Sequence, residues 1–144
     1  MDTNLKGTDE MEITVQNPTG MRLEAQLGDF TVATDQPAAD GGDNSAPSPF
    51  DLFLASLATC AGYYVLAFCK QRNLPTEGIS VSMRNDWNEN KHLAENISLD
   101  IRLPADIPAK YHKAIRRAAG MCTVKRHLEN PPAFDLRIRN GHPD

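Results

Sequence analysis

The stretch from Leu52 to Cys69 limits the possible folds of this chain more than any other, because its eighteen residues include no charged side chain. A run of that length reaches the lower limit for a membrane-spanning helix. However, Ser56, Thr59 and Gly62 interrupt it, and the sequence that follows has the alternating pattern of soluble strands. We therefore interpret the run as a helix buried within protein rather than within a membrane.

Signals for the start and end of this helix flank the run. Ser48 is a good N-cap, Pro49 suits the first helical position, and Asp51 lies three residues after the cap. This spacing resembles a capping box in which Asp replaces the usual Glu or Gln. The pattern predicts a helix that lasts to about Arg72 and ends before Pro75.

The length of the chain makes such a helix hard to bury. The 144 residues fit one domain, residues 1–144, with a core of its own. A helix of this length spans about 30 Å, and a single small domain has little chain with which to surround it. We therefore expect a homodimer in which the helix packs against its own sheet and against the partner. The alternative is a monomer wrapped around one central helix.

The remaining elements follow from alternating hydrophobicity and from turn residues. Gly28 and Asp29 indicate a turn between two strands, and residues 36–47 form a Pro-, Gly- and Asp-rich loop. The order is βββ–α–ββ–αα–β, which predicts an α+β domain with antiparallel sheets. The predicted strands are 11–18, two within 21–35, 77–88, 97–104 and 133–140, and the predicted later helices are 106–121 and 123–130.

Composition argues against several classes of function. The net charge is −4 and no Lys/Arg cluster forms a basic face, so we expect no nucleic-acid partner. The polar start MDTNLKGTDEME predicts no signal peptide. Three cysteines do not suggest a secreted disulfide scaffold, and we expect a reducing cytoplasm. The four histidines lack metal-site spacing and no phosphate-binding loop is present, so neither a metal nor a cofactor is predicted.

The three cysteines differ in their surroundings. Cys122 falls at the predicted start of a helix with Lys125 and Arg126 just beyond it, a setting that lowers a thiol pKa. The alternative is a Cys next to a helix cap whose cationic neighbours face water. Cys60 lies in the middle of the long helix, where a Cys is usually a small core residue. Cys69 points to the opposite face of that helix, and we expect it in the core or the dimer interface.

Two segments together resemble a known family. PSPFDLFLASLATCAGYYV, residues 47–65, followed by CTVKRHLEN, residues 122–130, is similar to the OsmC/Ohr family of osmotically induced and organic hydroperoxide resistance proteins, and in particular to its OsmC-like branch. The resemblance covers nearly the whole chain. It implies the OsmC-like fold, with antiparallel sheets around a long central helix, and an intertwined homodimer with two active sites at the subunit interface.

The resemblance also implies a thiol chemistry. Cys60 would be the catalytic thiolate that an organic hydroperoxide oxidises to sulfenic acid, and Cys122 would resolve it as a disulfide. A dithiol or another thiol would then reduce the pair. The chemistry is consistent, because attack on an O–O bond requires thiolate and a nearby second thiol prevents over-oxidation.

The chain departs from the peroxidase pattern at the start of the helix. The peroxidases carry a Glu directly after the Pro, and Phe50 occupies that place here, with the acid one position later at Asp51. Asp51 is thus a candidate catalytic residue with a competing explanation as a helix cap. Arg22 is the candidate for the family's thiolate-holding Arg, although it could equally be a solvated strand residue. Thr123 replaces the usual Pro after the second Cys, and we expect it to be tolerated because either residue can begin a helix.

Three functions remain open from the sequence. The first is a peroxidase that reduces organic hydroperoxides through Cys60 and Cys122. The second is a thiol/disulfide redox or sulfur-transfer protein. The third is a non-catalytic dimeric module that binds a small apolar ligand.

Overall fold

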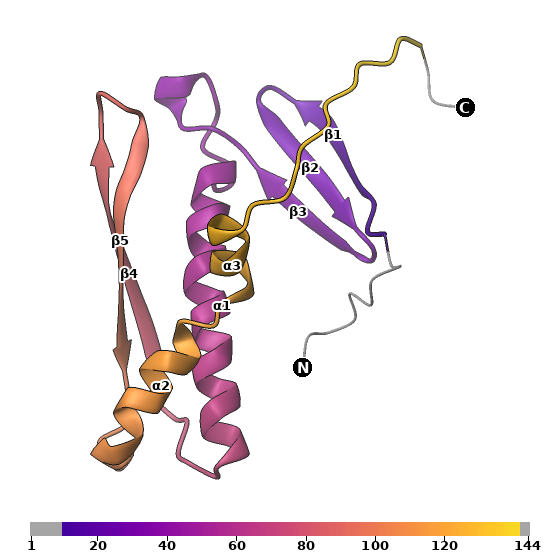
Figure 1. Ribbon diagram of the computed structural model, residues 1–144. Helices are drawn as coiled ribbons and strands as arrows, with labels where there is room; N and C mark the ends of the chain where they lie inside the picture. The colour runs from indigo at the N-terminus through magenta and orange to yellow at the C-terminus, as the bar shows by residue number, and fades with distance from the viewer. Residues whose placement is uncertain (1–9, 142–144) are drawn as a thin grey trace. The chain divides into compact units, whose positions relative to one another are not determined.

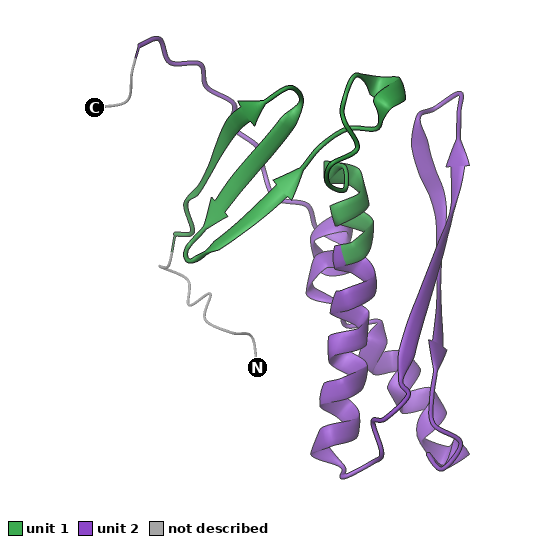
Figure 2. Ribbon diagram, turned by 180° about the vertical axis from the view of Figure 1, so that it is seen from behind, with its two compact units in different colours: residues 1–55 green, residues 56–144 purple. Residues whose placement is uncertain are grey.

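The computed structural model describes residues 10–141, so the start of the chain and His142 lie outside the described residues. The chain divides into two compact units, unit 1 up to Ala55 and unit 2 from Ser56 (Figure 2). The elements follow one another as three strands, a long helix, two strands and two shorter helices (Figure 1). The predicted α+β class is confirmed, with antiparallel sheets and a long central helix.

Unit 1 contains a three-stranded antiparallel sheet in the order β1–β2–β3. The strands are β1 (Ile13–Thr19), β2 (Arg22–Leu27) and β3 (Phe30–Thr34), and the predicted turn at Gly28–Asp29 joins the last two. Paired residues share one face of a sheet. The register therefore places the apolar residues of the three strands together and the polar ones on the other face. The apolar face remains largely open, since Val15 is 54% and Phe30 is 76% exposed.

The long helix α1 (Pro49–Gln71) matches the predicted bounds closely. By length and composition it could cross a membrane, with a mean hydropathy of 1.8 over its most apolar window. Core helices of soluble proteins meet the same criteria. Only 22% of that window is buried within the chain, and Tyr63 and Leu66 are 40% and 37% exposed. Much of this apolar helix is therefore uncovered in a single chain.

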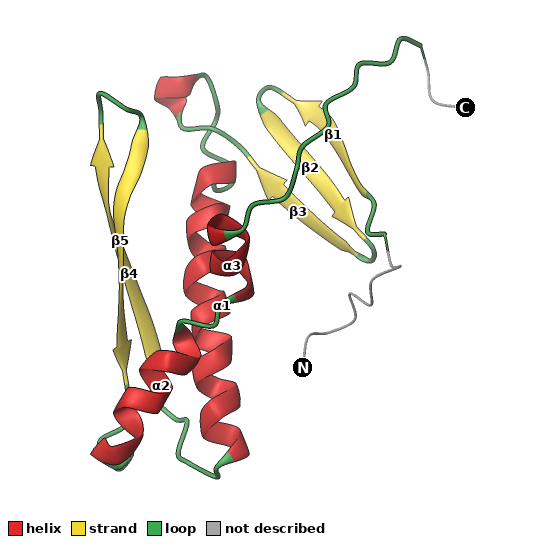
Figure 3. Cartoon of the chain, in the orientation of Figure 1, coloured by secondary structure: helices red, strands yellow, loops and turns green. Residues whose placement is uncertain are grey.

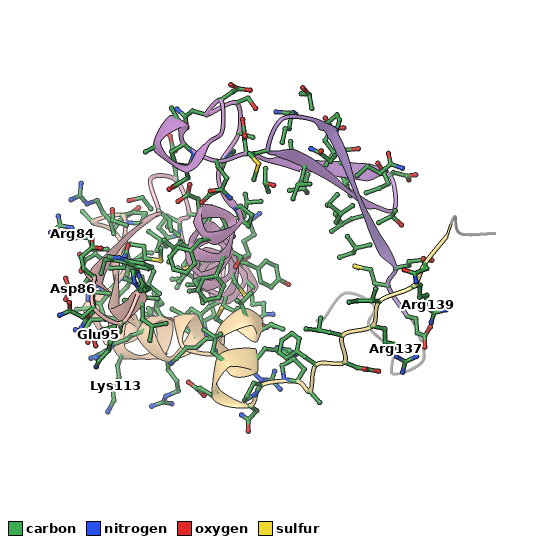
Figure 4. All side chains as sticks on the ribbon, turned by 90° about the horizontal axis from the view of Figure 1, so that it is seen from above. Arg84, Asp86, Glu95, Lys113, Arg137 and Arg139 are labelled. Carbon is green, nitrogen blue, oxygen red and sulfur yellow. The ribbon has the colours of Figure 1, made fainter. Side chains whose placement is uncertain are left out.

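Unit 2 continues with a hairpin of β4 (Ser80–Asn88) and β5 (Leu93–Arg102). The second strand begins four residues earlier than predicted, because a short turn ends at His92 and pairing starts at once. The register places Val81 opposite Ile101 on the apolar face. The charged side chains of Arg84 and Asp86 project from the hairpin away from α1 (Figure 4).

Three short helices follow the hairpin. The turn η2 (Ala109–Tyr111) leads into α2 (His112–Ala119), and α3 (Thr123–Glu129) begins after a short turn (Figure 3). The core of unit 2 forms where α2 and the segment before it pack on one stripe of α1. Its buried members are Ala61, Val65, Cys69, Ile107, Ile115 and Ala119. Cys69 is fully buried there, as predicted.

The predicted strand at residues 133–140 is wrong for the single chain. These residues are extended but form no strand (Figure 3). A strand needs a neighbour with which to exchange backbone hydrogen bonds, and the described chain provides none here. The apolar side chains that suggested the strand are almost fully exposed: Phe134 is 84%, Leu136 94% and Ile138 95% exposed.

Candidate functional site

Cys60 lies in the middle of α1, next to the stripe that faces the core. Its neighbours Leu57 and Ala61 are buried, whereas Cys60 is only partly so. The position follows from helical geometry, because a residue just beside the apolar stripe sits at the edge of the core. The Cys60 thiol is therefore held by a rigid helix and is still partly open to solvent.

Cys122 is brought to α1 by the end of one helix and the start of the next. Gly120 ends α2, and Cys122 is the N-cap of α3, with extended backbone angles of φ −49° and ψ 124°. Its sulfur accepts a hydrogen bond from the backbone N–H of Lys125 at 3.5 Å. The Cys122 side chain is 2% exposed, so this thiol is much more enclosed than that of Cys60.

The two thiols are neighbours. Cys60 lies near enough to Cys122 to raise the pKa of the Cys122 thiol. Both cysteines are free and both belong to unit 2. Residues 62 positions apart in the sequence are thus folded near each other.

The expected low pKa of Cys122 is not found, since the pKa of this thiol is raised. Burial is the largest cause, and the neighbouring Cys60 adds to it. The backbone N–H groups of Lys125 and Val124 lower the pKa as a helix start should, but burial outweighs them. The Lys125 ammonium pairs instead with Glu129 at 3.5 Å. Cys122 is therefore kept as a thiol.

A hydrogen bond between two side chains joins the helices that carry the cysteines. The hydroxyls of Tyr64, one turn after Cys60, and Thr123, directly after Cys122, lie 2.8 Å apart. Thr123 is also the first residue of α3, as the sequence predicts for a residue replacing Pro. Proline has no hydroxyl, so this link depends on the departure from the family pattern. Its partner, 59 residues away, could not be identified from the sequence.

A cavity of about 300 Å³ opens beside Cys122. Its walls come from α1, β5, α2 and α3, all within unit 2. The apolar part includes Leu57, Leu99 and Leu128, and the cations Arg116 and Lys125 also line it. Sequence reasoning did not identify this cavity, because its lining residues come from four separate segments.

Arg22, the candidate thiolate-holding residue, lies in unit 1 at the start of β2. Its guanidinium donates to the Ser45 hydroxyl at 3.0 Å and pairs with Glu24 at 3.3 Å. Ser45 is in turn held by Asp35, which is 1% exposed and accepts bonds from the Ser45 hydroxyl and backbone N–H. These bonds, with others from Gln36 and Asp43, lower the pKa of Asp35 to about 2.

Asp51 forms the predicted capping box. Its carboxylate accepts the backbone N–H of Ser48 at 3.1 Å, and the Ser48 hydroxyl accepts the backbone N–H of Asp51 at 3.2 Å. The competing explanation of Asp51 as a cap is thus confirmed. Its catalytic role remains a prediction.

The histidines and acids of residues 10–141 do not gather into a group of three that could hold a metal ion. His127, the histidine closest in sequence to Cys122, contacts the backbone carbonyl of Thr123 through Nδ1 at 2.7 Å. The chemical groups of the site are therefore two thiols, two hydroxyls and nearby cations. This set suits sulfur chemistry.

Comparison with known families identifies the family of this chain. Residues 42–137 match the family model described as OsmC-like protein. The chain belongs to the OsmC-like family. The match includes both Cys60 and Cys122 and ends at residue 137, within the unpaired segment 133–140. A search of curated proteins finds no match.

Solved structures share the OsmC-like fold at low sequence identity. A Psychrobacter arcticus 273-4 protein, provisionally named an osmotic stress induced and detoxification response protein, is 19% identical with a TM-score of 0.72, covering 85% of this chain and 90% of that one. The OsmC like protein of Mycoplasma pneumoniae is 14% identical with a TM-score of 0.66, and the match covers 86% of this chain and 90% of that one. The organic hydroperoxide resistance protein OsmC of Legionella pneumophila is 15% identical with a TM-score of 0.57, and the match covers 85% of this chain and 91% of that one.

Proposed function

We propose that this protein is a thiol-dependent peroxidase that reduces organic hydroperoxides through Cys60 and Cys122. The observation that carries the proposal is the proximity of the two thiols, of which that of Cys60 is partly open and that of Cys122 is enclosed. The Cys60 thiolate attacks the O–O bond of the hydroperoxide and becomes a sulfenic acid. The organic part of the hydroperoxide leaves as an alcohol. The Cys122 sulfur then attacks the Cys60 sulfur, releasing water and forming the disulfide.

The environments of the two cysteines suit this division of roles. A partly exposed sulfur on a rigid helix can meet a hydroperoxide, whereas an enclosed thiol with a raised pKa reacts poorly with peroxide in solution. The enclosed thiol would nevertheless be the first to meet an oxidised Cys60, because the two residues lie near each other. Apolar Leu57 and aromatic Tyr64 flank Cys60 on the helix and favour an alkyl or lipid hydroperoxide over hydrogen peroxide.

The proposal also includes a homodimer. Three apolar surfaces remain uncovered in the single chain: much of α1, one face of the sheet β1–β3, and the alternating side chains of 133–140. A soluble monomer rarely leaves so much apolar surface in contact with water. A second copy would cover these surfaces and would give residues 133–140 a strand to pair with.

Arg22 and Asp51 keep proposed roles in this chemistry. Arg22 would stabilise the Cys60 thiolate, and Asp51 would orient Arg22 while capping α1. We expect Arg22→Ala to slow the first oxidation step more than Arg22→Lys, because Lys retains the charge. If Asp51 only closes the capping box, Asp51→Asn should change that rate little, because the amide oxygen of Asn can still accept the backbone N–H of Ser48.

The decisive experiment treats the reduced protein with one equivalent of cumene hydroperoxide and follows free thiols and mass. The peroxidase proposal predicts the loss of two thiols and a Cys60–Cys122 disulfide. Cys60→Ser should abolish this loss, Cys122→Ser should leave a sulfenic acid on Cys60, and Cys69→Ser is the control that should react normally. Inertness to peroxide with formation of a mixed disulfide would favour a thiol/disulfide protein instead, and inertness to both would favour a binding module.

The dimer has its own test. Light scattering on the purified protein should give twice the mass of the chain. Leu136→Asp places a charge on the apolar side of the segment 133–140 and should weaken the dimer, while Arg137→Asp on its other side is the matched control. A monomeric wild-type protein would contradict this part of the proposal.

A further inference from the structure

The loop between β3 and α1 is closed at its base by hydrogen bonds. The backbone N–H of Asp35 donates to the carbonyl of Pro47 at 3.1 Å, and that of Asn44 donates to the carbonyl of Gln36 at 3.0 Å. These bonds join the two ends of residues 35–47 within unit 1. A compact loop whose ends are joined keeps its side chains in defined places.

Asp35 lies at the centre of this loop. The residue is 1% exposed, and its carboxylate accepts four hydrogen bonds. The donors are the hydroxyl of Ser45 and the backbone N–H groups of Gln36, Asp43 and Ser45. Gly42 allows the chain to close this tightly, because an added Cβ would clash with the backbone of Gln36 and with the Asp35 carboxylate. A buried carboxylate with this many donors fixes the loop around it.

The hydroxyl of Ser45 connects Asp35 to Arg22 of β2. The Ser45 Oγ lies 2.6 Å from the Asp35 carboxylate and 3.0 Å from Nη1 of Arg22. A carboxylate only accepts hydrogen bonds, and a guanidinium only donates them. The hydroxyl must therefore donate to Asp35 and accept from Arg22, so the three groups form one chain of charge-assisted bonds.

The guanidinium of Arg22 is held at two of its three nitrogens. Nη1 also donates to the carbonyl of Ser45 at 3.4 Å, and Nε donates to Glu24 at 3.3 Å. Nη2 has no acceptor among residues 10–141, and the Arg22 side chain is 30% exposed. Because the group is planar and rigid, fixing two nitrogens sets the direction of the third. Arg22 thus offers an oriented N–H donor to an anion from outside this network.

We propose that Asp35 and Ser45 are positioning residues that orient Nη2 of Arg22 toward the thiolate of Cys60. The inference rests on the proposed function, in which Arg22 stabilises that thiolate. A guanidinium that is already fixed loses little side-chain entropy when the thiolate forms, so its charge acts more strongly than that of a free Arg. Asp35 and Ser45 act through Arg22 and not on the sulfur itself.

The experiment measures how readily Cys60 ionises, and it requires no peroxide. The reduced full-length protein is treated with iodoacetamide, which reacts with thiolate rather than thiol. Peptide mass follows alkylation of Cys60 at about pH 7 and at about pH 10, where a thiol ionises without help. We expect Ser45→Ala to slow alkylation about threefold to tenfold at the lower pH and to leave it unchanged at the higher pH. Arg22→Ala should slow it at least as much.

The comparison of the two pH values separates positioning from damage to the fold. A loosened fold would change access to Cys60 and therefore the rate at both pH values. Ser45→Thr retains a hydroxyl and should keep the wild-type rates. Asp35→Asn should behave like Ser45→Ala, because an amide cannot accept all four hydrogen bonds. Asp40→Asn is the matched control, since it removes the same charge from an exposed acid of the same loop, and its rates should equal those of the wild type.

A second measurement reports on the guanidinium directly. In protein labelled with nitrogen-15, the Nε–H of Arg22 should give a sharp resonance, assigned by its loss in Arg22→Lys, because a held guanidinium exchanges its protons slowly with water. The resonance should broaden or disappear in Ser45→Ala and in Asp35→Asn. A resonance that neither variant changes would overturn the inference.

The outcomes distinguish this inference from the proposed function. If Arg22→Ala slows alkylation at about pH 7 but Ser45→Ala and Asp35→Asn do not, the positioning role is wrong and the role of Arg22 stands. If Arg22→Ala has no effect, both roles are wrong. If the expected rates are found but peroxide forms no disulfide with Cys60, the positioning role stands and the peroxidase proposal alone fails.

Discussion

The hydrogen bond between Tyr64 and Thr123 is the contact whose removal should most directly affect the thiol pair. It links α1 to α3 at 2.8 Å, one turn from Cys60 and one residue from Cys122. Tyr64→Phe and Thr123→Val each remove one hydroxyl and retain the bulk of the side chain. Each leaves the other hydroxyl partly buried without this partner, so we expect a loss of about 1–2 kcal/mol in the free energy of unfolding for each single variant.

The double variant, with both Tyr64→Phe and Thr123→Val, gives the interaction energy between the two hydroxyls. Once both hydroxyls are gone, no unpaired group remains, and the two losses should not add. We expect a coupling energy of about 1 kcal/mol from urea unfolding of the four proteins. If the same energy holds the two sulfurs together, the rate of disulfide closure after one equivalent of peroxide should fall about fivefold in either single variant.

The assay is stopped-flow measurement of thiol loss, with Tyr63→Phe as the matched control. Tyr63 is the adjacent residue of α1, is 40% exposed, and stacks edge-on against Tyr64 through a ring that Phe retains. Coupling below about 0.3 kcal/mol would refute the link, since distant independent sites already differ from additivity by that much. Unchanged closure rates together with clear coupling would show that the bond stabilises the fold but does not position the sulfurs.

Three further predictions concern residues outside this link. Gly42→Ala should lower the free energy of unfolding by about 2–3 kcal/mol, measured by urea unfolding, because an added Cβ would clash with the backbone oxygen of Gln36. The lowered pKa of Asp35 contributes stability that is complete above its unfolded value of 3.8 and is lost as pH falls through about 2. The urea midpoint of the wild type should therefore decrease over that range more than that of Asp35→Asn. Cys69→Ala should leave the peroxide-driven loss at two thiols, since Cys69 is fully buried and burial raises its pKa; loss of only one thiol would assign Cys69 a redox role.

The sequence by itself determined the elements whose signals are local. The capping box of Ser48 and Asp51, the turn at Gly28 and the alternation of the first three strands each depend on residues close together in the chain, and each is found as predicted. The family resemblance also had a local basis, in the motifs around Cys60 and Cys122, and the family match confirms it.

Tertiary structure decided the features that depend on distant partners. The segment 133–140 has the pattern of a strand but no neighbour in the single chain, because pairing requires a second strand and not merely a suitable sequence. The pKa of Cys122 is raised although its helix start and nearby cations suggested the opposite, because burial depends on what packs around the thiol. The hydroxyl of Thr123 meets Tyr64, 59 residues away, and no local pattern encodes a contact across that separation.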